Sequence, residues 1–454
     1  MLRLYDTATG SEAVLSGADN GRIGLYVCGP TVYGPPHIGH GRFALTYDIL
    51  RRYLESTGVG VRHVSNVTDI DDKIIHLANA EHRSSHDVAV EYEAEWWAAM
   101  DALGIAKPTV VPHATDYVAE MVEMIAELVR LEVAYETSDG VYLEVAKVEG
   151  YGLLAQQPLD SLRAGGSSRV EVNEEKRAPF DFALWKKAKA GEPAWESGFG
   201  EGRPGWHTEC VVMALALLGE GFSLHGAGED LKFPHNENER AQAVALGRPY
   251  ASHWMHNGML MQAGEKMAKS VGNVVDLASL VSKYDPRAYR LVIAQSHYRA
   301  PIELGASNLE AAEEALRRID ALARRLEEAG TVVPADAVAD ALTADFRAHM
   351  DDDLATPQAI GVLFGAVTAA NSAFDRGDGP AGVALGRAAL RGFEAVGLVA
   401  IGAATVPAHV LELARRRDEA RAGRDWAAAD RLRHEIVDAG YRVEDTPGGT
   451  RVYR

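Results

Sequence analysis

The chain has 454 residues, of which 47% are apolar and 24% are charged, so it can bury a real core and shows no sign of disorder or of a fibrous repeat. A chain of this length is too long for one ordinary hydrophobic core and suggests about three folding units. The net charge of −19 excludes a protein that coats nucleic acid non-specifically, because neutralising phosphates needs a surplus of Lys and Arg, although a local basic surface could still hold RNA.

The two cysteines, Cys28 and Cys210, exclude a disulfide scaffold and leave three options: buried thiols, a reactive thiol or metal ligands. The first residues lack the apolar run of a signal peptide, and the longest apolar stretch, residues 211–218, is too short to cross a bilayer. We therefore expect a cytoplasmic protein with no membrane partner.

The first part of the chain predicts a Rossmann-like, doubly wound parallel sheet. Residues 22–27 form a short apolar run that ends in a turn at Cys28. A helical pattern over residues 41–55 follows, and a second apolar run, residues 59–67, leads to Asp69. Strand, helix and strand in this order form the unit of such a sheet, whose ligand crevice lies outside the carboxyl ends of the strands. We expect Cys28 and Asp69 to lie there.

The later sequence predicts an insertion and two further domains. The stretch from about residue 110 to residue 200 contains helical segments and turns rich in Gly and Lys. This pattern predicts a domain inserted into a catalytic domain of residues 1–304. Residues 305–400 are rich in Ala, Leu, Arg and Glu at helical spacing, which predicts an α-helical bundle. Residues 401–454 combine a basic helix with the pattern of a hairpin and predict a small mixed α/β domain.

The segment from His37 to His40 lies where the first turn becomes a helix. A helix N-terminus presents backbone N–H groups and a positive dipole end to phosphates, the two imidazoles add donors, and Gly39 lets a base approach closely. This arrangement predicts an ATP site for adenylation of a carboxylate, in which His37 and His40 stabilise the charge that develops on the α-phosphate. The alternative is two surface histidines beside a turn, and four residues alone leave it open.

A second motif lies in a region of about 260–304. There Lys266, Lys269 and Ser270 form a loop flanked by Gly, suited to the leaving pyrophosphate, although such a loop alone is more often a solvated turn. The two motifs in this order resemble the class I aminoacyl-tRNA synthetases, whose signatures are His-Ile-Gly-His and Lys-Met-Ser-Lys-Ser. Ala268 departs from the second, where the family usually has serine. The resemblance implies catalytic roles for both histidines and both lysines, with ATP and Mg²⁺ as substrate.

A metal site is the third prediction. His235 and Glu239 are spaced i and i+4, so they share one helix face and can meet one ion. Cys28 and Cys210 could complete four ligands of kinds that zinc takes readily, and such a site can open a position for a substrate thiol. The alternatives are cysteines buried as apolar residues and a solvated helix pair, and spacing alone does not link the two cysteines.

Four segments resemble the cysteinyl-tRNA synthetases, and the resemblance covers essentially the whole chain. The segments are residues 26–33, 66–73, 202–210 and 254–258. In that family one zinc per chain selects the thiolate of cysteine over serine, and its ligands fall on Cys28, Cys210, His235 and Glu239.

The resemblance also implies a cysteine pocket and one departure near the metal. The pocket residues are Gly29, Thr31, Thr68, Asp69 and Trp206. For Asp69, an N-cap on the following helix is the alternative. Asn236 replaces a histidine that the family usually carries beside the zinc ligands, so the second layer of contacts around the metal differs.

The C-terminal tail reverses the sign of the chain's charge. Residues 407–454 hold ten arginines and nine carboxylates, a net of +1 against −20 for the rest. We predict one basic helix, interleaved with Trp426, that carries Arg415, Arg416, Arg417, Arg421, Arg424, Arg431 and Arg433. A salt-bridged, solvated helix is the alternative to RNA contact. The resemblance implies that residues 401–454 bind the anticodon of tRNA-Cys and that the chain is a monomer.

The resemblance implies a two-step reaction. L-cysteine and ATP give cysteinyl-adenylate and pyrophosphate, and cysteine then passes to the 3′-terminal adenosine of tRNA-Cys. The alternative is a tRNA-independent cysteine ligase of mycothiol synthesis, against which the tail and residues 30–33 argue. A nucleotidyltransferase would also use His-x-Gly-His, and a pure RNA-binding module would explain the tail, but neither needs a zinc–thiol pocket.

Overall fold

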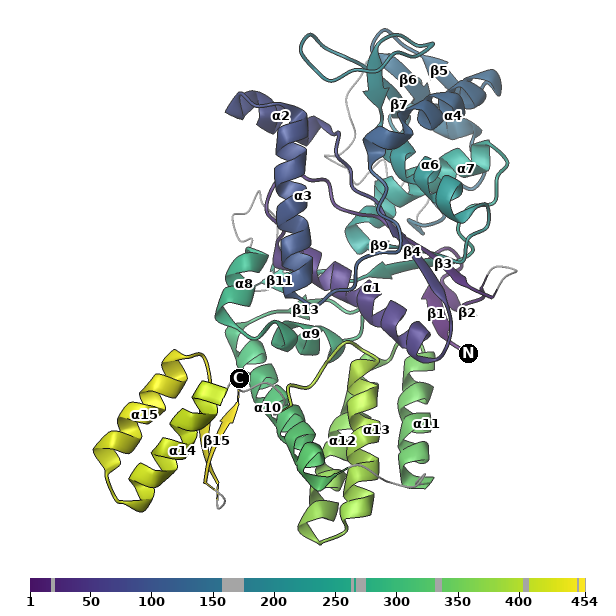
Figure 1. Cartoon of the computed structure of the whole chain (residues 1–454). Helices are drawn as coiled ribbons and strands as arrows, with labels where there is room; N and C mark the ends of the chain where they lie inside the picture. The colour runs from purple at the N-terminus through teal and green to yellow at the C-terminus, as the bar shows by residue number, and fades with distance from the viewer. Residues whose placement is uncertain are drawn as a thin grey trace. The chain divides into compact units, whose positions relative to one another are not determined.

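The computed structural model describes residues 1–17, 21–156, 175–262, 265–266, 275–330, 337–402, 408–446 and 449–453. The chain forms two compact units (Figure 1). The core unit comprises Met1–Glu313, Asp345–Ile360 and Ala395–Gly397, and the C-terminal unit comprises Glu314–Ala344, Gly361–Glu394 and Leu398–Arg454. In the described part of the chain, no helix is both long and apolar enough to cross a membrane.

Four parallel strands form the central sheet of the core unit, in the order β10-β9-β3-β4. They are β3 (Ile23–Val27), β4 (Val61–Ser65), β9 (Leu224–Gly228) and β10 (Trp254–Asn257). The chain adds β4 on one side of β3 and later adds β9 and β10 on the other. Because the order reverses between β3 and β9, their carboxyl ends flank the crevice in which such sheets bind ligands. The predicted Rossmann-like sheet is confirmed.

Helix α1 (Ile38–Ser56) connects β3 to β4 and begins earlier than the predicted start at residue 41. The reason is local, because the side chain of His37 caps the helix. Close packing holds the helix in place: a Cβ atom at Gly41 would lie 2.9 Å from the ring of Tyr289 in α9 (Pro286–Ala294).

An antiparallel sheet lies within the stretch where the sequence predicts an insertion (Figure 1). Its order is β5-β6-β7-β8, and helix α4 (Val118–Arg130) shares its core, to which Leu184 and Trp185 contribute. The strands are β5 (Ala134–Glu136), β6 (Gly140–Leu143), β7 (Phe182–Lys187) and β8 (Gly202–Pro204).

The remaining elements of the core unit surround these sheets. The helices are α2 (Asp72–Glu81), α3 (Ser85–Ala102), η1 (Ala114–Tyr117), η2 (Val145–Lys147), α6 (Trp206–Leu218), η3 (Glu229–Leu231), η4 (Lys232–Asn236), α7 (Glu237–Ala245) and α8 (Leu277–Lys283). The strands are the hairpin β1 (Arg3–Asp6) and β2 (Ser11–Val14), and a small sheet of β11 (Leu260–Gln262), β12 (Glu265–Lys266) and β13 (Ile302–Glu303).

Long helices begin at residue 306, as the sequence pattern indicates. They are α10 (Ala306–Ala329), α11 (Ala337–Asp351), α12 (Thr356–Asp375) and α13 (Gly379–Glu394). Inside the C-terminal unit they pack closely: Cβ atoms at Gly386 and Gly392 would lie 3.0 Å from Leu326 of α10 and 2.3 Å from Leu363 of α12. The helical bundle of the predicted fold class is therefore present.

The end of the chain forms two helices and a hairpin, so the prediction of one basic helix is wrong. The helices are α14 (Ala408–Ala422) and α15 (Trp426–Asp438), and the hairpin consists of β14 (Arg442–Thr446) and β15 (Gly449–Tyr453). The break has a physical reason. Arg424 adopts a left-handed backbone with φ of 58°, and Asp425 then caps α15 by accepting a hydrogen bond from the N–H of Ala428.

Candidate active site and metal centre

A cavity of about 300 Å³ opens beside the carboxyl ends of β3 and β9. It therefore lies at the crevice that the reversal of strand order creates. Seven of the predicted site residues line it: Cys28, Gly29, Thr31, His37, Gly39, His40 and Trp206. The fold thus brings the histidine pair and one candidate metal ligand to the same space.

His37 and His40 hold each other at the start of α1. The Nδ1 atom of His37 accepts a hydrogen bond from the backbone N–H of His40 at 3.3 Å, and Nδ1 of His40 accepts one from the N–H of His37 at 3.2 Å. The rings stack with centroids 3.6 Å apart. Because both Nδ1 atoms act as acceptors, each neutral ring carries its proton on Nε2. The pair therefore provides two N–H donors beside a helix N-terminus, which suits phosphate oxygens.

Cys28, Cys210, His235 and Glu239 form a buried cluster whose ligand atoms all lie within 4.8 Å of one another. Four separate elements bring them together: Cys28 follows β3, Cys210 lies in α6, His235 in η4 and Glu239 in α7. Within the cluster, His235 Nε2 is 3.0 Å from Glu239 Oε1 and 3.6 Å from Cys210 Sγ. Cys28 Sγ is 3.5 Å from Glu239 Oε1.

The chemistry of these donors fits a metal cation. Burial lowers the pKa of His235 to about 4, so its ring is neutral and keeps a lone pair for coordination. Burial alone would raise the pKa of Glu239, but His225 and His235 outweigh it and lower the pKa to about 2, which keeps the carboxylate ionised. Burial raises the pKa of the Cys28 thiol. Two thiols, a neutral imidazole and a buried carboxylate form a set that a cation would stabilise.

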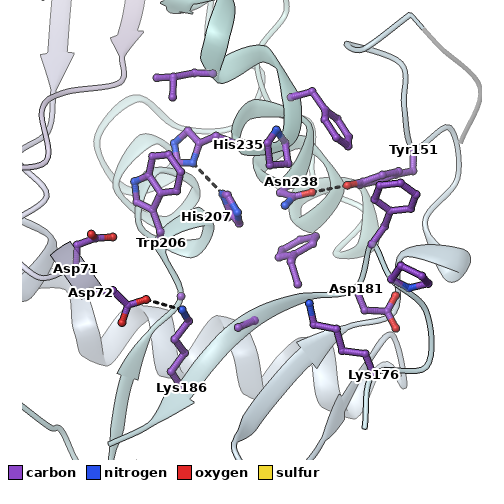
Figure 2. A pocket seen from close by; sticks show the side chains of 18 of the residues that line it. Asp71, Asp72, Tyr151, Lys176, Asp181, Lys186, Trp206, His207, His235 and Asn238 are labelled. Carbon is purple, nitrogen blue, oxygen red and sulfur yellow. Dashed lines mark hydrogen bonds and ion pairs between the residues drawn. The ribbon is translucent and has the colours of Figure 1, made fainter. Parts of the chain in front are cut away.

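A second layer of side chains orients the cluster. His207 and His235 share a hydrogen bond between their Nδ1 atoms at 2.9 Å (Figure 2). For His235 Nε2 to coordinate a metal, its Nδ1 must carry the proton and donate to His207. The hydroxyl of Tyr250 donates to Glu239 Oε2 at 3.0 Å, and His225 Nε2 donates to the same oxygen at 2.8 Å.

Sequence reasoning missed His207, His225 and Tyr250. A weak signal existed for His225, which is a polar residue in the otherwise apolar strand β9, and it is fully buried. His207 lies one turn before Cys210 on the same helix. No local pattern marks Tyr250.

The side chain of Asn236 contacts two of the candidate metal ligands, Glu239 and Cys28. Its Nδ2 donates to Glu239 Oε1 at 2.8 Å and to Cys28 Sγ at 3.5 Å. His256 Nε2 donates to Asn236 Oδ1 at 3.0 Å, while Nδ1 of His256 accepts from the hydroxyl of Thr7 at 2.8 Å, and this chain fixes the amide orientation. Asn236 therefore supplies contacts to the candidate metal ligands at the position where the family usually has a histidine.

Replacing Asn236 with leucine should lower zinc affinity about 10- to 100-fold, the usual cost of losing an outer-layer hydrogen bond to a ligand. Competition with a chromogenic chelator measures the affinity. Asn236→His is the matched control, because histidine can also donate to Glu239, and it should retain most of the affinity. Equal affinity in the leucine variant and the unmodified protein would contradict a supporting role for Asn236.

Two protein-family models and many curated relatives match the chain. Residues 14–314 match the catalytic domain of the class I tRNA synthetases (C), and residues 345–398 match the DALR domain. Cysteine–tRNA ligases from Thermotoga maritima and Chromobacterium violaceum are 40% and 41% identical, each over 99% of both chains. The chain belongs to the cysteine–tRNA ligase family. The corresponding ligase from Micrococcus luteus is 41% identical over 98% of both chains.

Solved structures support the fold of this cysteine–tRNA ligase family member. Methionyl-tRNA synthetase from Mycobacterium tuberculosis, bound by methionyl-adenylate, superposes with a TM-score of 0.64 at 14% identity, over 83% of this chain and 92% of that one. A leucyl-tRNA synthetase from Agrobacterium radiobacter superposes with a TM-score of 0.63 at 11% identity, over 85% of each chain. At these identities the likeness establishes the architecture alone.

Some of the residues that the resemblance to this family selects lie away from the cavity. Thr68 is buried beside Thr31, and its hydroxyl donates to Glu209 Oε2 at 2.8 Å. The carboxylate of Asp69 accepts hydrogen bonds from the N–H and hydroxyl of Thr115. Asp71, not Asp69, caps α2, so the N-cap alternative for Asp69 is wrong. Substrate contact by Thr68 and Asp69 stays a prediction.

The predicted lysine loop lies largely outside the described residues. The backbone of Lys266 forms part of β12, which pairs with Met261 of β11. Lys269 and Ser270 fall outside the part of the chain that the structure describes. The contacts of these three residues with the phosphates stay predictions.

Proposed function

We propose that the chain activates L-cysteine with ATP and transfers it to the 3′-terminal adenosine of tRNA-Cys. The observation that carries this proposal is the position of Cys28, which belongs to the metal cluster and also lines the cavity of His37 and His40. A thiol-binding centre and a phosphate-binding helix start therefore share one space. A single substrate with a thiol and an activated carboxylate would reach both.

In the first step the carboxylate of cysteine attacks the α-phosphate of Mg²⁺-bound ATP, and pyrophosphate leaves. The Nε2–H groups of His37 and His40 would donate to the α-phosphate oxygens as negative charge develops on them. Gly39 leaves room for the adenine base. We assign Lys266, Lys269 and Ser270 to the leaving pyrophosphate, with Ala268 removing one hydroxyl contact that the family usually has.

We propose zinc as the metal that Cys28, Cys210, His235 and Glu239 hold. When bound there, it would supply a soft Lewis acid that takes the substrate thiolate and so distinguishes cysteine from serine, a near isostere that an apolar pocket rejects only about a hundredfold. Trp206 packs on the ring of His235 with centroids 4.0 Å apart and lines the cavity. It would form one wall of the cysteine site, with Gly29 and Thr31 along the strand end and Thr68 and Asp69 behind it.

We assign tRNA binding outside the active site to the C-terminal residues. Several arginines of the predicted basic helix are already paired: Arg415 with Glu412 and Glu419, and Arg417 and Arg421 with Asp445. The surface for RNA would therefore rest on α15 and the turn before it, where Trp426 is 60% exposed. The arginines of this surface are Arg424, Arg431 and Arg433.

Deleting residues 401–454 should spare cysteine activation and weaken charging. Activation is measured as cysteine-dependent ATP–pyrophosphate exchange, and charging as the attachment of labelled cysteine to tRNA. The expected result is an unchanged exchange rate and a raised KM for tRNA. Unchanged charging would contradict the assignment of the tail to RNA binding.

Charging of unfractionated tRNA with labelled cysteine tests the function itself, with serine as the matched substrate control. Charging with cysteine and not with serine is the expected result. Cysteine-dependent pyrophosphate exchange with no charging would point to the small-molecule cysteine ligase. We also propose that the protein is a monomer in the cytoplasm, where a reducing environment keeps both thiols from forming disulfides. Light scattering tests the oligomeric state.

A further inference from the structure

Arg42 is a buried cation in the wall of the active-site cavity, and no step of the proposed chemistry uses it. It lies two residues after His40 on α1 and is 1% exposed. The cavity that His37 and His40 line is also lined by Arg42. Because a cation removed from water is costly to place, the contacts of its guanidinium group indicate what the side chain does there.

The guanidinium group of Arg42 holds three backbone carbonyls on two segments of the chain. Its Nη1 donates to the carbonyl of Met259 at 2.5 Å, and its Nη2 donates to the carbonyls of Tyr298, at 3.1 Å, and Ala300. Met259 immediately precedes β11, which lies beside α1 (Figure 1), and the other two residues precede β13. The planar fork of arginine can span both segments, which the single ammonium of lysine cannot do.

Two of these carbonyls also join the two segments to each other. The carbonyl of Met259 accepts a hydrogen bond from the N–H of Ile302 at 3.1 Å. The carbonyl of Tyr298 accepts one from the N–H of Gly258 at 2.8 Å. The segments lie so close that a Cβ atom at Gly258 would be 2.5 Å from the carbonyl oxygen of Arg299. The guanidinium group therefore holds a closely packed pair of segments.

The segment that contains β11 leads to the first lysine of the predicted loop. Strand β11 pairs with β12 through Met261, which lies opposite Lys266. The chain beyond the loop is held to the same helix, because the N–H of Ile38 donates to the carbonyl of Val275 at 3.1 Å. The start of α1 carries the histidine pair, β12 carries Lys266, and Arg42 connects the two through β11.

The positive charge of Arg42 is stabilised by carbonyls alone. Within the described ranges of the chain, no carboxylate forms an ion pair with Arg42. Burial lowers its pKa to about 10, so the group is still charged at neutral pH. Hydrogen bonds to a charged group are roughly twice as strong as those between neutral groups. Any movement of β11 away from α1 would remove partners from a buried charge, so the connection resists such movement.

We propose that Arg42 is a positioning residue for the activation step. Its fork fixes the separation between the histidine pair and the strand that carries Lys266, so that both meet the phosphates of ATP at the same time. The inference rests on the proposed function and adds a residue that acts through the groups it holds. Pyrophosphate has left before cysteine passes to the tRNA, so this separation should matter far less in the transfer step.

The test compares Arg42→Lys with Arg290→Lys in the full-length protein. Arg290 of α9 is a matched control, because it is also 1% exposed and donates to three backbone carbonyls, those of Leu103, Gly104 and Val396. It is not among the residues that line the active-site cavity. Each substitution keeps the charge and removes the fork, so both should lower the unfolding temperature.

Arg42→Lys should lower kcat for ATP–pyrophosphate exchange about 10- to 100-fold, the effect of a misplacement of about 1 Å. The KM for ATP should stay within about threefold, because positioning is felt mainly in the transition state. Single-turnover transfer from enzyme-bound cysteinyl-adenylate should stay within about twofold, because the phosphates that are positioned take no part in it. Arg290→Lys should leave all of these quantities unchanged.

Three results would overturn the inference: an unchanged kcat in Arg42→Lys, an equal loss of kcat in Arg290→Lys, or equal losses in the activation and transfer steps of Arg42→Lys. If the lysine variant does not fold, Arg42→Gln and Arg290→Gln replace the pair with the same outcomes, because glutamine can donate to a carbonyl and carries no buried charge. Failure of the proposed function has a different signature, because the unmodified protein would then show no cysteine-dependent pyrophosphate exchange at all.

Discussion

Replacing Cys210 with serine should remove the metal and abolish cysteine activation together. Loss of an outer-layer contact already costs about 10- to 100-fold in metal affinity, so the loss of a ligand itself should exceed about a hundredfold. Elemental analysis after dialysis against a chelator measures the metal. About one zinc per chain is expected in the unmodified protein, because one four-ligand cluster is present among the residues that the structure describes. Cysteine-dependent pyrophosphate exchange measures activation.

Val212→Ala provides the control for this experiment. Val212 is a buried residue on the same helix, α6, and carries no donor atom, so its truncation should lower stability and leave the metal in place. A Cys210→Ser protein that lost the metal and still activated cysteine would show that the thiol is recognised in another way. Purified protein without metal and with full activity would dismiss the zinc centre.

The second large effect is expected at the histidine pair. Replacing His40 with alanine removes one Nε2–H donor to the α-phosphate and should lower the rate of activation about 10²- to 10³-fold, the usual effect of removing one such donor. Pyrophosphate exchange at saturating ATP measures the rate. Because His40 also holds the N–H of His37, a thermal unfolding curve must accompany the assay.

Asparagine at position 37 separates catalysis from stability. His37 caps α1, and loss of a cap costs about 0.5–2 kcal/mol, but asparagine is itself a favoured N-cap residue. His37→Asn should therefore unfold near the temperature of the unmodified protein and still lose activation about a hundredfold. An active His37→Asn enzyme would show that His37 serves only the start of the helix.

The sequence predicts the parallel sheet and the histidine turn because both depend on local patterns. A short apolar run, a helical period and another apolar run specify β3, α1 and β4, and two residues three apart suffice for the cap. The metal centre is different. Cys28 and Cys210 come from distant segments, and their approach depends on how β3 and α6 pack, which spacing does not contain. The resemblance to a family, rather than the pattern itself, predicted the cluster that the structure places together.

Contacts across elements explain what the sequence did not predict. His225 reaches Glu239 of helix α7 from strand β9, and Tyr250 reaches it from the loop after α7, so no periodicity links these residues. In the tail, the pairs of Arg415 follow the i−3 and i+4 spacing of a helix and could have been anticipated. The pairing of Arg417 with Asp445 depends on how the hairpin folds back on α14.

The reciprocal hydrogen bonds of His37 and His40 settle the position of two protons before any nucleotide arrives. Moving either proton to Nδ1 would break a bond to the backbone at the start of α1, so folding itself selects the tautomer. The enzyme thus meets its substrate with the proton of each ring already on Nε2. The free-energy cost of orienting these N–H dipoles is met when the chain folds, so it does not recur in each catalytic cycle.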